Sequence, residues 1–191
     1  IAGSWDPDDP TAPTSAHGIR GIVPEAEVYF FPLVDRDSLQ TGGRQDTAWI
    51  NAMSVLNPGD VLCAAYRPLV TATGQPNLAY WVDTNNLIAQ ATSMGITVVI
   101  AAGDRGVDLS AIDYPNDGVD PLAIVAAGVS PGEPFKRWVD GRDGSCFTAA
   151  SVDFSKITCA AWAQGVTTCG MGPGRDGWLG AKTILYNQSG G

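Results

Sequence analysis

The chain has 191 residues, of which 45% are hydrophobic and 16% charged, and its formal net charge is −9. This composition is that of a globular chain, and its length suffices for one good core, so we expect a single domain over residues 1–191. The negative charge argues against nucleic acid and acidic membrane surfaces, and no apolar run approaches the ~18–20 residues of a membrane helix. Low lysine content with abundant Gly, Ser and Thr favours an extracellular, secreted protein.

Residues 1–18 are expected to be irregular, because three prolines interrupt an acidic stretch. Its carboxylates, Asp6, Asp8 and Asp9, are of the kind that calcium binds. The prolines and the lack of a ligand-spaced glycine spoil any known calcium-loop pattern. We therefore favour a solvated loop here and predict neither a metal nor another cofactor.

The next segments predict a strand, a helix and a second strand. Residues 27–34, EVYFFPLV, form the first strand, and its proline marks a strand end or a sheet edge. A helical apolar stripe follows with Asp46 as its N-cap, made by Trp49, Ala52, Met53 and Leu56. Residues 57–59, Asn-Pro-Gly, end that helix. Residues 61–66 then form a short apolar strand, in which Cys63 is interpreted as a core thiol.

The clearest pattern covers a helix over residues 77–94 and the strand after it. Leu87, Ala91 and Met94 form the apolar stripe of the helix, with Ile88 alongside, and Gly95 ends it. Residues 96–102 are an unbroken, β-branched apolar run that predicts a strand buried on both faces. The strand ends in a Gly-Asp-Arg-Gly turn, which places Asp104 just beyond its carboxyl end. In open α/β sheets, ligands and chemistry gather at that edge.

Residues 122–129 predict another buried strand, so strands and helices alternate as in parallel βαβ units. Short β segments then follow among glycine clusters, at residues 157–162, 166–169 and 183–186. The four cysteines have no metal-type spacing. A disulfide such as Cys159–Cys169 is plausible, but the sequence leaves the three complete pairings open.

Two familiar catalytic patterns are present only in part. His17 is the only histidine, and its loop contains nothing that would orient the ring for a Ser-His-Asp triad. Residues 128–132 read G-x-S-x-G after a strand, the pattern of a nucleophile elbow. However, the residue after Ser130 is Pro131, which has no N–H to donate to an oxyanion. We interpret His17 as an exposed loop residue and the elbow pattern as coincidence.

Six segments in the same order resemble the subtilisin-like serine peptidases. ATSMGITVVIAAGD resembles that family's A…GvvVVaAAGN, GIVPEAEV resembles GVAPxAxL, and DVLCAAY resembles DVINMSLG. YP followed by LAIVAAG is similar to YPA…viaVGA, and ITCAAWAQGVTTCG is similar to vdvaAPGxxvxTtg. YNQSGG resembles the approach to the nucleophile motif G-T-S. The resemblance implies a three-layer α/β/α fold with a mostly parallel central sheet.

The same resemblance assigns substrate-facing positions. Ala65, Tyr66 and Arg67 match the strand that pairs with the substrate backbone, and Ala101, Ala102 and Gly103 match one wall of the specificity pocket. Asp104 stands where the family has its oxyanion-hole asparagine. An amide donates a hydrogen bond to the developing oxyanion, whereas only a protonated carboxyl can do so. An aspartate here is similar to the acid-active sedolisins, although their Glu-Asp-Ser set is not located in this sequence.

The resemblance also implies that the triad lies outside these residues. The chain would begin just after the catalytic histidine and end just before the nucleophile, and no G-T-S occurs within it. We therefore expect the central part of a single, partial subtilisin-like peptidase domain that is inactive alone and acts on polypeptide substrates. The alternative is a non-catalytic subtilisin-like module for peptide binding or assembly. In both, a complementary chain is expected to cover apolar sheet surface that the missing helices leave open.

Overall fold

A computed structural model describes ten segments of the chain. They are residues 22–23, 25–33, 45–66, 78–111, 122–130, 136–140, 143–148, 156–163, 166–169 and 186–189. The chain divides into two compact units, one formed by Ile1–Phe30 with Gln164–Gly190 and the other by Phe31–Ala163 with Gly191. The second unit holds the main sheet and the candidate site, so the description concentrates on it. The expected single domain over residues 1–191 stays a prediction.

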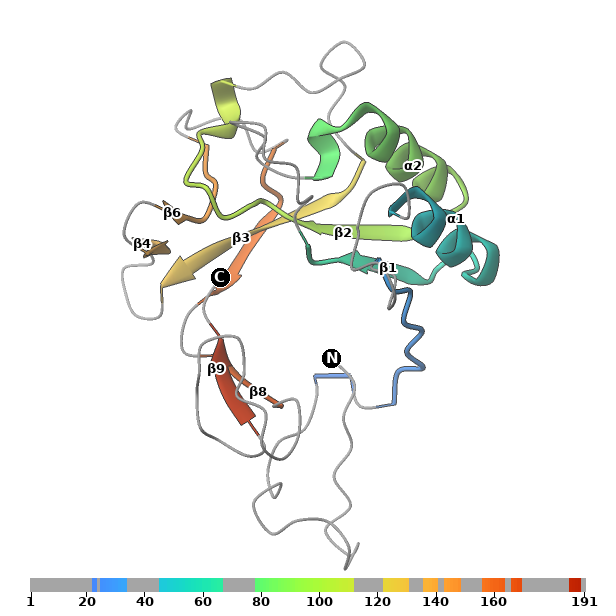
Figure 1. Ribbon diagram of the computed structural model, residues 1–191, viewed down its shortest axis with the longest axis horizontal. Helices are drawn as coiled ribbons and strands as arrows, with labels where there is room; N and C mark the ends of the chain where they lie inside the picture. Colours follow the sequence, from blue (N-terminus) through green and yellow to red (C-terminus); the bar gives the residue numbers. More distant parts are fainter. Residues whose placement is uncertain are drawn as a thin grey trace, which may run out of the picture. The chain divides into compact units, whose positions relative to one another are not determined.

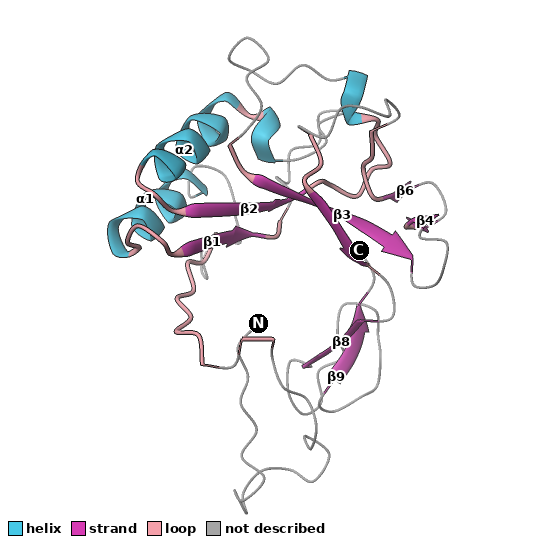
Figure 2. Ribbon diagram, turned by 180° about the vertical axis from the view of Figure 1, so that it is seen from behind, coloured by secondary structure: helices cyan, strands magenta, loops and turns pink. Residues whose placement is uncertain are grey.

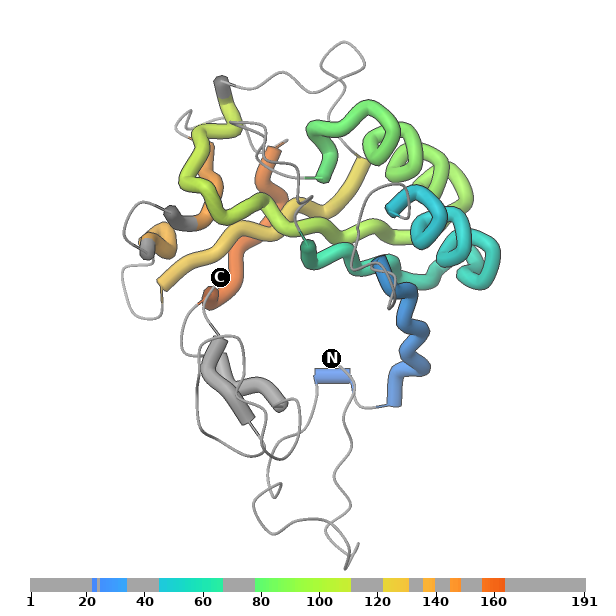
Figure 3. Tube along the Cα trace, viewed as in Figure 1, coloured from blue at the N-terminus to red at the C-terminus, as the bar shows by residue number. Residues whose placement is uncertain are grey.

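The second unit is built on a five-stranded, mostly parallel sheet. Strands β1 (Val61–Ala64), β2 (Thr97–Ala101) and β3 (Ile124–Ser130) lie in sequence order and pair in parallel. Strand β7 (Cys159–Trp162) pairs in parallel with β3, and β4 (Lys136–Arg137) is antiparallel to the end of β3. Figures 1 and 3 show this path along the chain. The predicted α/β class with a mostly parallel sheet is confirmed.

The two main helices lie where the periodicity predicts them. Helix α1 (Gln45–Val55) precedes β1, and α2 (Val82–Ser93) follows the short 3-10 helix η2 (Leu78–Tyr80) and precedes β2. Gly95, with φ of 81°, takes the left-handed conformation that ends α2, as predicted. The predicted N-cap Asp46 is wrong, because it already lies in the first turn of α1.

The helices bury one apolar face each against the sheet. Trp49, Ala52 and Met53 of α1 are buried as predicted, and Leu56 packs against the same core. The buried face of α2 is centred on Ile88 and Ala91, both 0% exposed. Leu87 is only partly buried and Met94 is 38% exposed, so the end of the expected stripe is wrong. Figures 1 and 2 show α1 and α2 side by side next to β1 and β2.

The core lies between these helices and one face of the sheet. Side chains alternate between the faces of a strand, and the parallel register brings Leu62 beside Val98, and Ile100 beside both Ala64 and Val125. Val98, Ile100 and Val125 are at most 1% exposed. Fully burying such a side chain stabilises the fold by roughly 1.5–3 kcal/mol.

The opposite face of the sheet is covered much less well. On β1, Val61 is 59% exposed and Cys63 is exposed, and Thr97 on β2 is exposed as well. The expectation that β2 is buried on both faces is therefore wrong, as is the interpretation of Cys63 as a core thiol. An apolar run predicts a strand, but it does not tell which of its faces is covered.

The first predicted strand is also wrong within its described part. Residues 27–33 form no strand, and Phe30 is 85% exposed. A run of apolar residues does not by itself make a strand, because an isolated strand has no sheet to stabilise it. Cys159 is a free thiol, so the suggested Cys159–Cys169 disulfide is not formed.

Four further strands form two small hairpins. Strands β5 (Val139–Asp140) and β6 (Asp143–Gly144) pair antiparallel in the second unit. In the first unit β8 (Val166–Cys169) pairs antiparallel with β9 (Tyr186–Ser189). Strand β8 covers the predicted residues 166–169. Of the segment predicted at residues 183–186, the structure describes only Tyr186, which begins β9. Among the described helices, none has the length and apolar character to cross a membrane.

Candidate functional site

A cavity of about 280 Å³ opens at the carboxyl ends of β1 and β2. Its lining includes six residues that the sequence assigned to substrate contact: Ala65, Tyr66, Ala101, Ala102, Gly103 and Asp104. The remaining walls come from β3, from β7 with the adjoining Ala163, and from Trp138 and Ser145. Parallel pairing brings the carboxyl ends of β1 and β2 to the same edge of the sheet, so residues that are far apart in the sequence, such as Tyr66 and Ala101, meet there.

Asp104 lies in a tight turn directly after β2, which we call the Asp104 turn (residues 103–107). Two glycines with positive φ frame it, Gly103 at 105° and Gly106 at 64°. Such angles are costly for residues with a Cβ, so these glycines allow the chain to reverse at once after the strand. Asp104 is exposed and lines the cavity. The turn therefore places a carboxyl at the edge of the sheet, as predicted.

A second segment, the strap (residues 145–147), holds the Asp104 turn. The Cys146 N–H donates to the Gly103 carbonyl at 2.9 Å, and the Phe147 N–H donates to the Val107 carbonyl at 3.0 Å. Burial raises the pKa of the Cys146 thiol, while hydrogen bonds from the backbone N–H groups of Val107, Arg105 and Gly106 act against this rise. The strap thus holds the turn at both ends through its main chain, and the Cys146 side chain is buried.

Tyr66 connects the cavity to helix α1. Its hydroxyl accepts a hydrogen bond from the Trp49 Nε1–H at 2.9 Å, and Trp49 is only 3% exposed. Burial raises the pKa of Tyr66 to about 12, the Trp49 hydrogen bond acts against the rise, and the charge of Asp46 adds to it. The phenol is therefore neutral at ordinary pH, and it acts as a hydrogen-bond acceptor fixed by the core.

The inner wall of the cavity is formed by β3 and the residues packed on it. The Gly128 N–H donates to the Ser145 Oγ at 2.7 Å, and the Ser145 hydroxyl donates to the Cys146 carbonyl at 3.0 Å. The Trp138 N–H donates to the Gly128 carbonyl at 3.0 Å. Because Ser145 is buried and its proton is already donated to a carbonyl, it is a structural residue and not a nucleophile.

The cavity is therefore apolar, with one exposed carboxyl at its rim. Alanine methyl groups and glycine backbone form much of its surface, and two indoles, Trp138 and Trp162, complete the walls. Such a surface accepts an apolar side chain or an extended backbone, and Asp104 provides the polar group that orients it. Among the described residues, no cluster of His, Cys, Asp or Glu is suited to hold a metal ion.

Sequence reasoning missed the residues that complete the cavity. Trp138 and Ser145 are buried residues of its lining, and they stand on either side of the β5–β6 hairpin in the sequence. In the sequence, Gly141 and Arg142 stand between these two short β segments, and a two-residue connection of the Gly-X type is a hairpin signal. It does not indicate that the hairpin packs beside Asp104.

Several expected residues fall outside the described segments. They are Arg67, His17, Asp6, Asp8 and Asp9, so the structure does not bear on their assignments. Ser130 is the last residue of β3, and the next element that the structure describes is the antiparallel strand β4. This arrangement agrees with the dismissal of the elbow pattern.

No protein-family model matches the chain, and no curated protein sequence matches it significantly.

Proposed function

We propose that these residues are the central part of a secreted subtilisin-like serine endopeptidase domain. In this proposal, a nucleophilic serine and its histidine and aspartate partners come from polypeptide outside residues 1–191. The serine attacks a peptide carbonyl at the edge of the sheet, and the substrate adds as an extended strand beside residues 65–67. The side chain next to the scissile bond enters the apolar cavity, and Asp104 faces the carbonyl oxygen.

The observation that carries the proposal is the convergence of six residues on one cavity. Ala65 and Tyr66 come from the end of β1, and residues 101–104 come from the end of β2. They belong to two separate motifs of the resemblance, which lie far apart in the sequence. Their meeting at the carboxyl ends of parallel strands supports a binding site at this edge.

The uncovered face of the sheet supports the finer, three-layer form of the fold. The described helices α1 and α2 pack on one face, while Val61 is 59% exposed and Cys63 is exposed on the other. Exposed apolar surface on a sheet face is normally covered by another element or another chain. In the proposal, helices that accompany the catalytic histidine and serine form this third layer.

Asp104 distinguishes the proposed enzyme from one with an amide in the oxyanion hole. A carboxylate repels the negative charge that develops on the carbonyl oxygen, whereas a protonated carboxyl donates a hydrogen bond to it. The proposed enzyme therefore either acts in acid or is a weak catalyst.

Fluorophosphonate labelling of the native protein tests the proposal. The reagent modifies activated serine nucleophiles, and mass spectrometry of the digested protein locates the modified residue. We expect one labelled serine outside residues 1–191, together with hydrolysis of unstructured polypeptides. Labelling of a serine within these residues, such as Ser145 or Ser130, would contradict the proposal.

A non-catalytic, peptide-binding module is the second candidate. It is favoured by the carboxyl of Asp104, which is a poor oxyanion-hole group when ionised, and by the absence of a G-T-S motif from these residues. If the native protein takes up no fluorophosphonate but binds unstructured peptides, and Trp138 or Trp162 fluorescence responds to them, this second function is supported.

A further inference from the structure

Two tryptophans reach the cavity from opposite edges of β3. The Trp138 N–H donates to the Gly128 carbonyl at 3.0 Å, whereas Trp162 of β7 pairs in parallel with Val129. Successive residues of a strand form their hydrogen bonds toward opposite edges, so Gly128 and Val129 bind the two segments on different sides. Both tryptophans line the cavity. The cavity therefore draws its two largest side chains from separate segments of the chain.

Gly128 permits both segments to approach β3 closely. A Cβ at this position would lie 2.7 Å from the Ala163 Cβ and 3.4 Å from the Ser145 Cβ, and the first distance is far shorter than a normal carbon–carbon contact. Ala163 directly follows Trp162, and the Ser145 N–H donates to the Trp138 carbonyl at 3.0 Å. The tight packing on Gly128 therefore fixes the backbone from which each indole extends.

The two tryptophans differ in how far the fold itself covers them. Trp138 is 8% exposed, so it is a fixed part of the wall, whereas Trp162 is 58% exposed. An indole offers a large apolar surface, and an aromatic partner gains affinity by stacking offset or edge-to-face against it. An exposed tryptophan that lines an apolar cavity is therefore a surface that an occupant of the cavity can cover.

The size and lining of the cavity favour one large, uncharged side chain as its occupant. Its volume of about 280 Å³ lies just below the range of roughly 300–1,000 Å³ for pockets that hold drug-sized ligands. Most of its lining residues are alanine or glycine, so the walls themselves take up little space. Among the lining residues that the structure describes, Asp104 alone carries a charge, and in the proposed function its carboxyl faces the scissile carbonyl. These walls then present no further charge to a lysine or arginine side chain.

We propose that Trp162 is a specificity-determining residue, and that the peptide residue whose side chain enters the cavity is aromatic. Its ring packs against the Trp162 indole, and the buried Trp138 forms a second aromatic wall. The inference rests on the proposed peptidase function, and it adds the class of the substrate residue that carries the scissile carbonyl. Trp162 itself takes no part in bond making or breaking.

Chromogenic peptides that differ only in this residue test the preference of the native protein. We expect kcat/KM to be highest for phenylalanine and about 10-fold lower for leucine, which lacks the aromatic contact. It should be at least about 10²-fold lower for alanine and lysine, because even one methylene group in an apolar pocket is worth about 10–200-fold. An equal or higher kcat/KM for leucine, alanine or lysine would overturn the proposal.

Substitution of Trp162 separates a role in specificity from a role in stability. Trp162→Ala should lower kcat/KM about 10-fold for the phenylalanine peptide and leave the alanine peptide unchanged, whereas Trp162→Phe should keep most of the preference. An equal loss for both peptides in Trp162→Ala would mean that the indole only stabilises the fold, and it would overturn the proposal.

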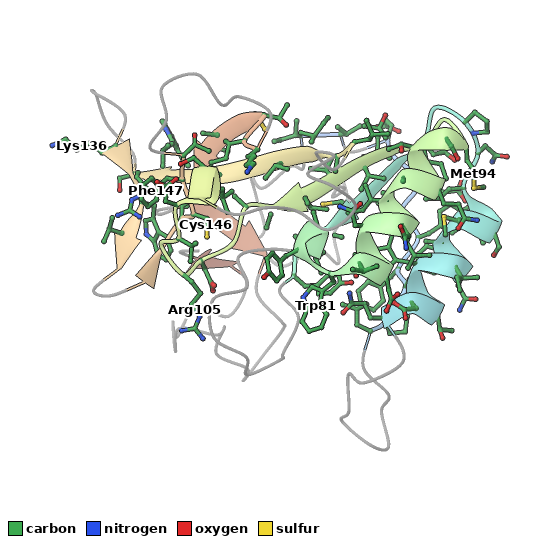
Figure 4. All side chains as sticks on the ribbon, turned by 90° about the horizontal axis from the view of Figure 1, so that it is seen from above. Trp81, Met94, Arg105, Lys136, Cys146 and Phe147 are labelled. Atoms are coloured by element: carbon green, nitrogen blue, oxygen red, sulfur yellow. The ribbon has the colours of Figure 1, made fainter. Side chains whose placement is uncertain are left out.

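Met94→Ala is the control for these variants. Met94 is also a partly exposed apolar side chain, and it is absent from the cavity lining that the structure describes. Figure 4 shows Met94 on the opposite side of the unit from Cys146, the neighbour of the cavity residue Ser145. Met94→Ala should therefore change kcat/KM for neither peptide.

Equilibrium binding separates this proposal from the peptidase function on which it rests. If the native protein hydrolyses none of the peptides, the proposed function fails, and calorimetry with the same intact peptides then tests the cavity by itself. The phenylalanine peptide should bind at least about 10-fold more tightly than the alanine peptide, and Trp162→Ala should remove most of this difference. If the phenylalanine peptide binds no more tightly, the role of Trp162 is overturned as well. If the peptides are cleaved without a preference for phenylalanine, only the role of Trp162 is overturned.

Discussion

Trp49 in α1 donates its Nε1–H to the hydroxyl of Tyr66 at 2.9 Å, and this bond joins the helical layer to the wall of the cavity. Tyr66 follows directly on the end of β1, so the hydrogen bond fixes one side of the site from the core. The two residues are 17 positions apart in the sequence, and the apolar patterns of α1 and β1 do not predict this contact.

Replacing Tyr66 by Phe should destabilise the fold. The substitution keeps the ring but leaves the buried Trp49 Nε1–H without its acceptor, which costs about 1–3 kcal/mol. The free energy of unfolding, measured with a chemical denaturant, checks this. Tyr29→Phe is the matched control, because Tyr29 is 51% exposed and its hydroxyl donates to the exposed Glu27. Equal effects in the two variants would contradict the role of the Trp49 bond.

Tyr66 should also make stability fall at high pH. Its folded-state pKa is raised from 10.0 to about 12, so the folded chain retains a proton that the unfolded chain releases. The stabilising contribution is therefore complete below pH 10 and is lost as the pH rises toward about 12. The difference in unfolding free energy between the unsubstituted protein and Tyr66→Phe should narrow over this interval. A difference that stays constant would show that Tyr66 titrates normally.

Replacing Asp104 by Asn should raise peptidase activity at neutral pH. The amide donates a hydrogen bond to the developing oxyanion, and one such donor is worth about 10²–10³-fold in kcat. Steady-state hydrolysis of a chromogenic peptide by the native protein measures the change. Asp83→Asn is the control, since Asp83 is exposed in the first turn of α2, and it should leave kcat unchanged. A loss of activity in Asp104→Asn would place Asp104 in another role.

Gly128→Ala should be destabilising through steric conflict in the cavity wall. A Cβ at this position would lie 2.7 Å from the Ala163 Cβ and 3.4 Å from the Ser145 Cβ. Overpacking of this kind typically costs about 1–3 kcal/mol. Adding Ala163→Gly removes the closest contact, so the double variant should recover much of the loss in thermal stability. If the double variant is as unstable as Gly128→Ala alone, the steric conflict lies at Ser145 and not at Ala163.

Thiol labelling of the native protein tests the proposed third layer. Cys63 is exposed on the uncovered face of the sheet, whereas Cys146 is buried. If additional helices cover that face, Cys63 should react with a thiol reagent as slowly as Cys146 until the protein is unfolded. A cysteine introduced by Ser93→Cys, at an exposed position of α2, serves as the fast-reacting control. Fast reaction of Cys63 would argue against a third layer.

The fold was predictable where local patterns and turn residues agree. The stripe of α1, the glycine after α2 and the β-branched run of β2 each carry a local signal, and these elements lie where expected. The covered face of β2 was not predictable, because an apolar run looks the same whether one or both faces are buried. Residues 27–33 show the same limit, since a strand also needs a neighbour.

The site was predictable only in its parts near the ends of β1 and β2. Ala65, Tyr66 and Asp104 follow apolar strands, and parallel pairing then brings strand ends together. Cys146 and Trp138 carry no such signal, because their place depends on how the chain after β3 returns to the Asp104 turn. That return is set by long-range packing and by the strap hydrogen bonds.

A crystal structure of the native protein with a peptidyl boronate tests the proposed site most directly. The boronate forms a tetrahedral adduct with the nucleophilic serine and mimics the oxyanion. We predict that its side chain occupies the cavity beside Ala101 and Gly103, with a boronate oxygen about 2.7–3.1 Å from the Asp104 carboxyl. A peptide bound elsewhere, with Asp104 facing solvent and the cavity empty, would contradict the proposal.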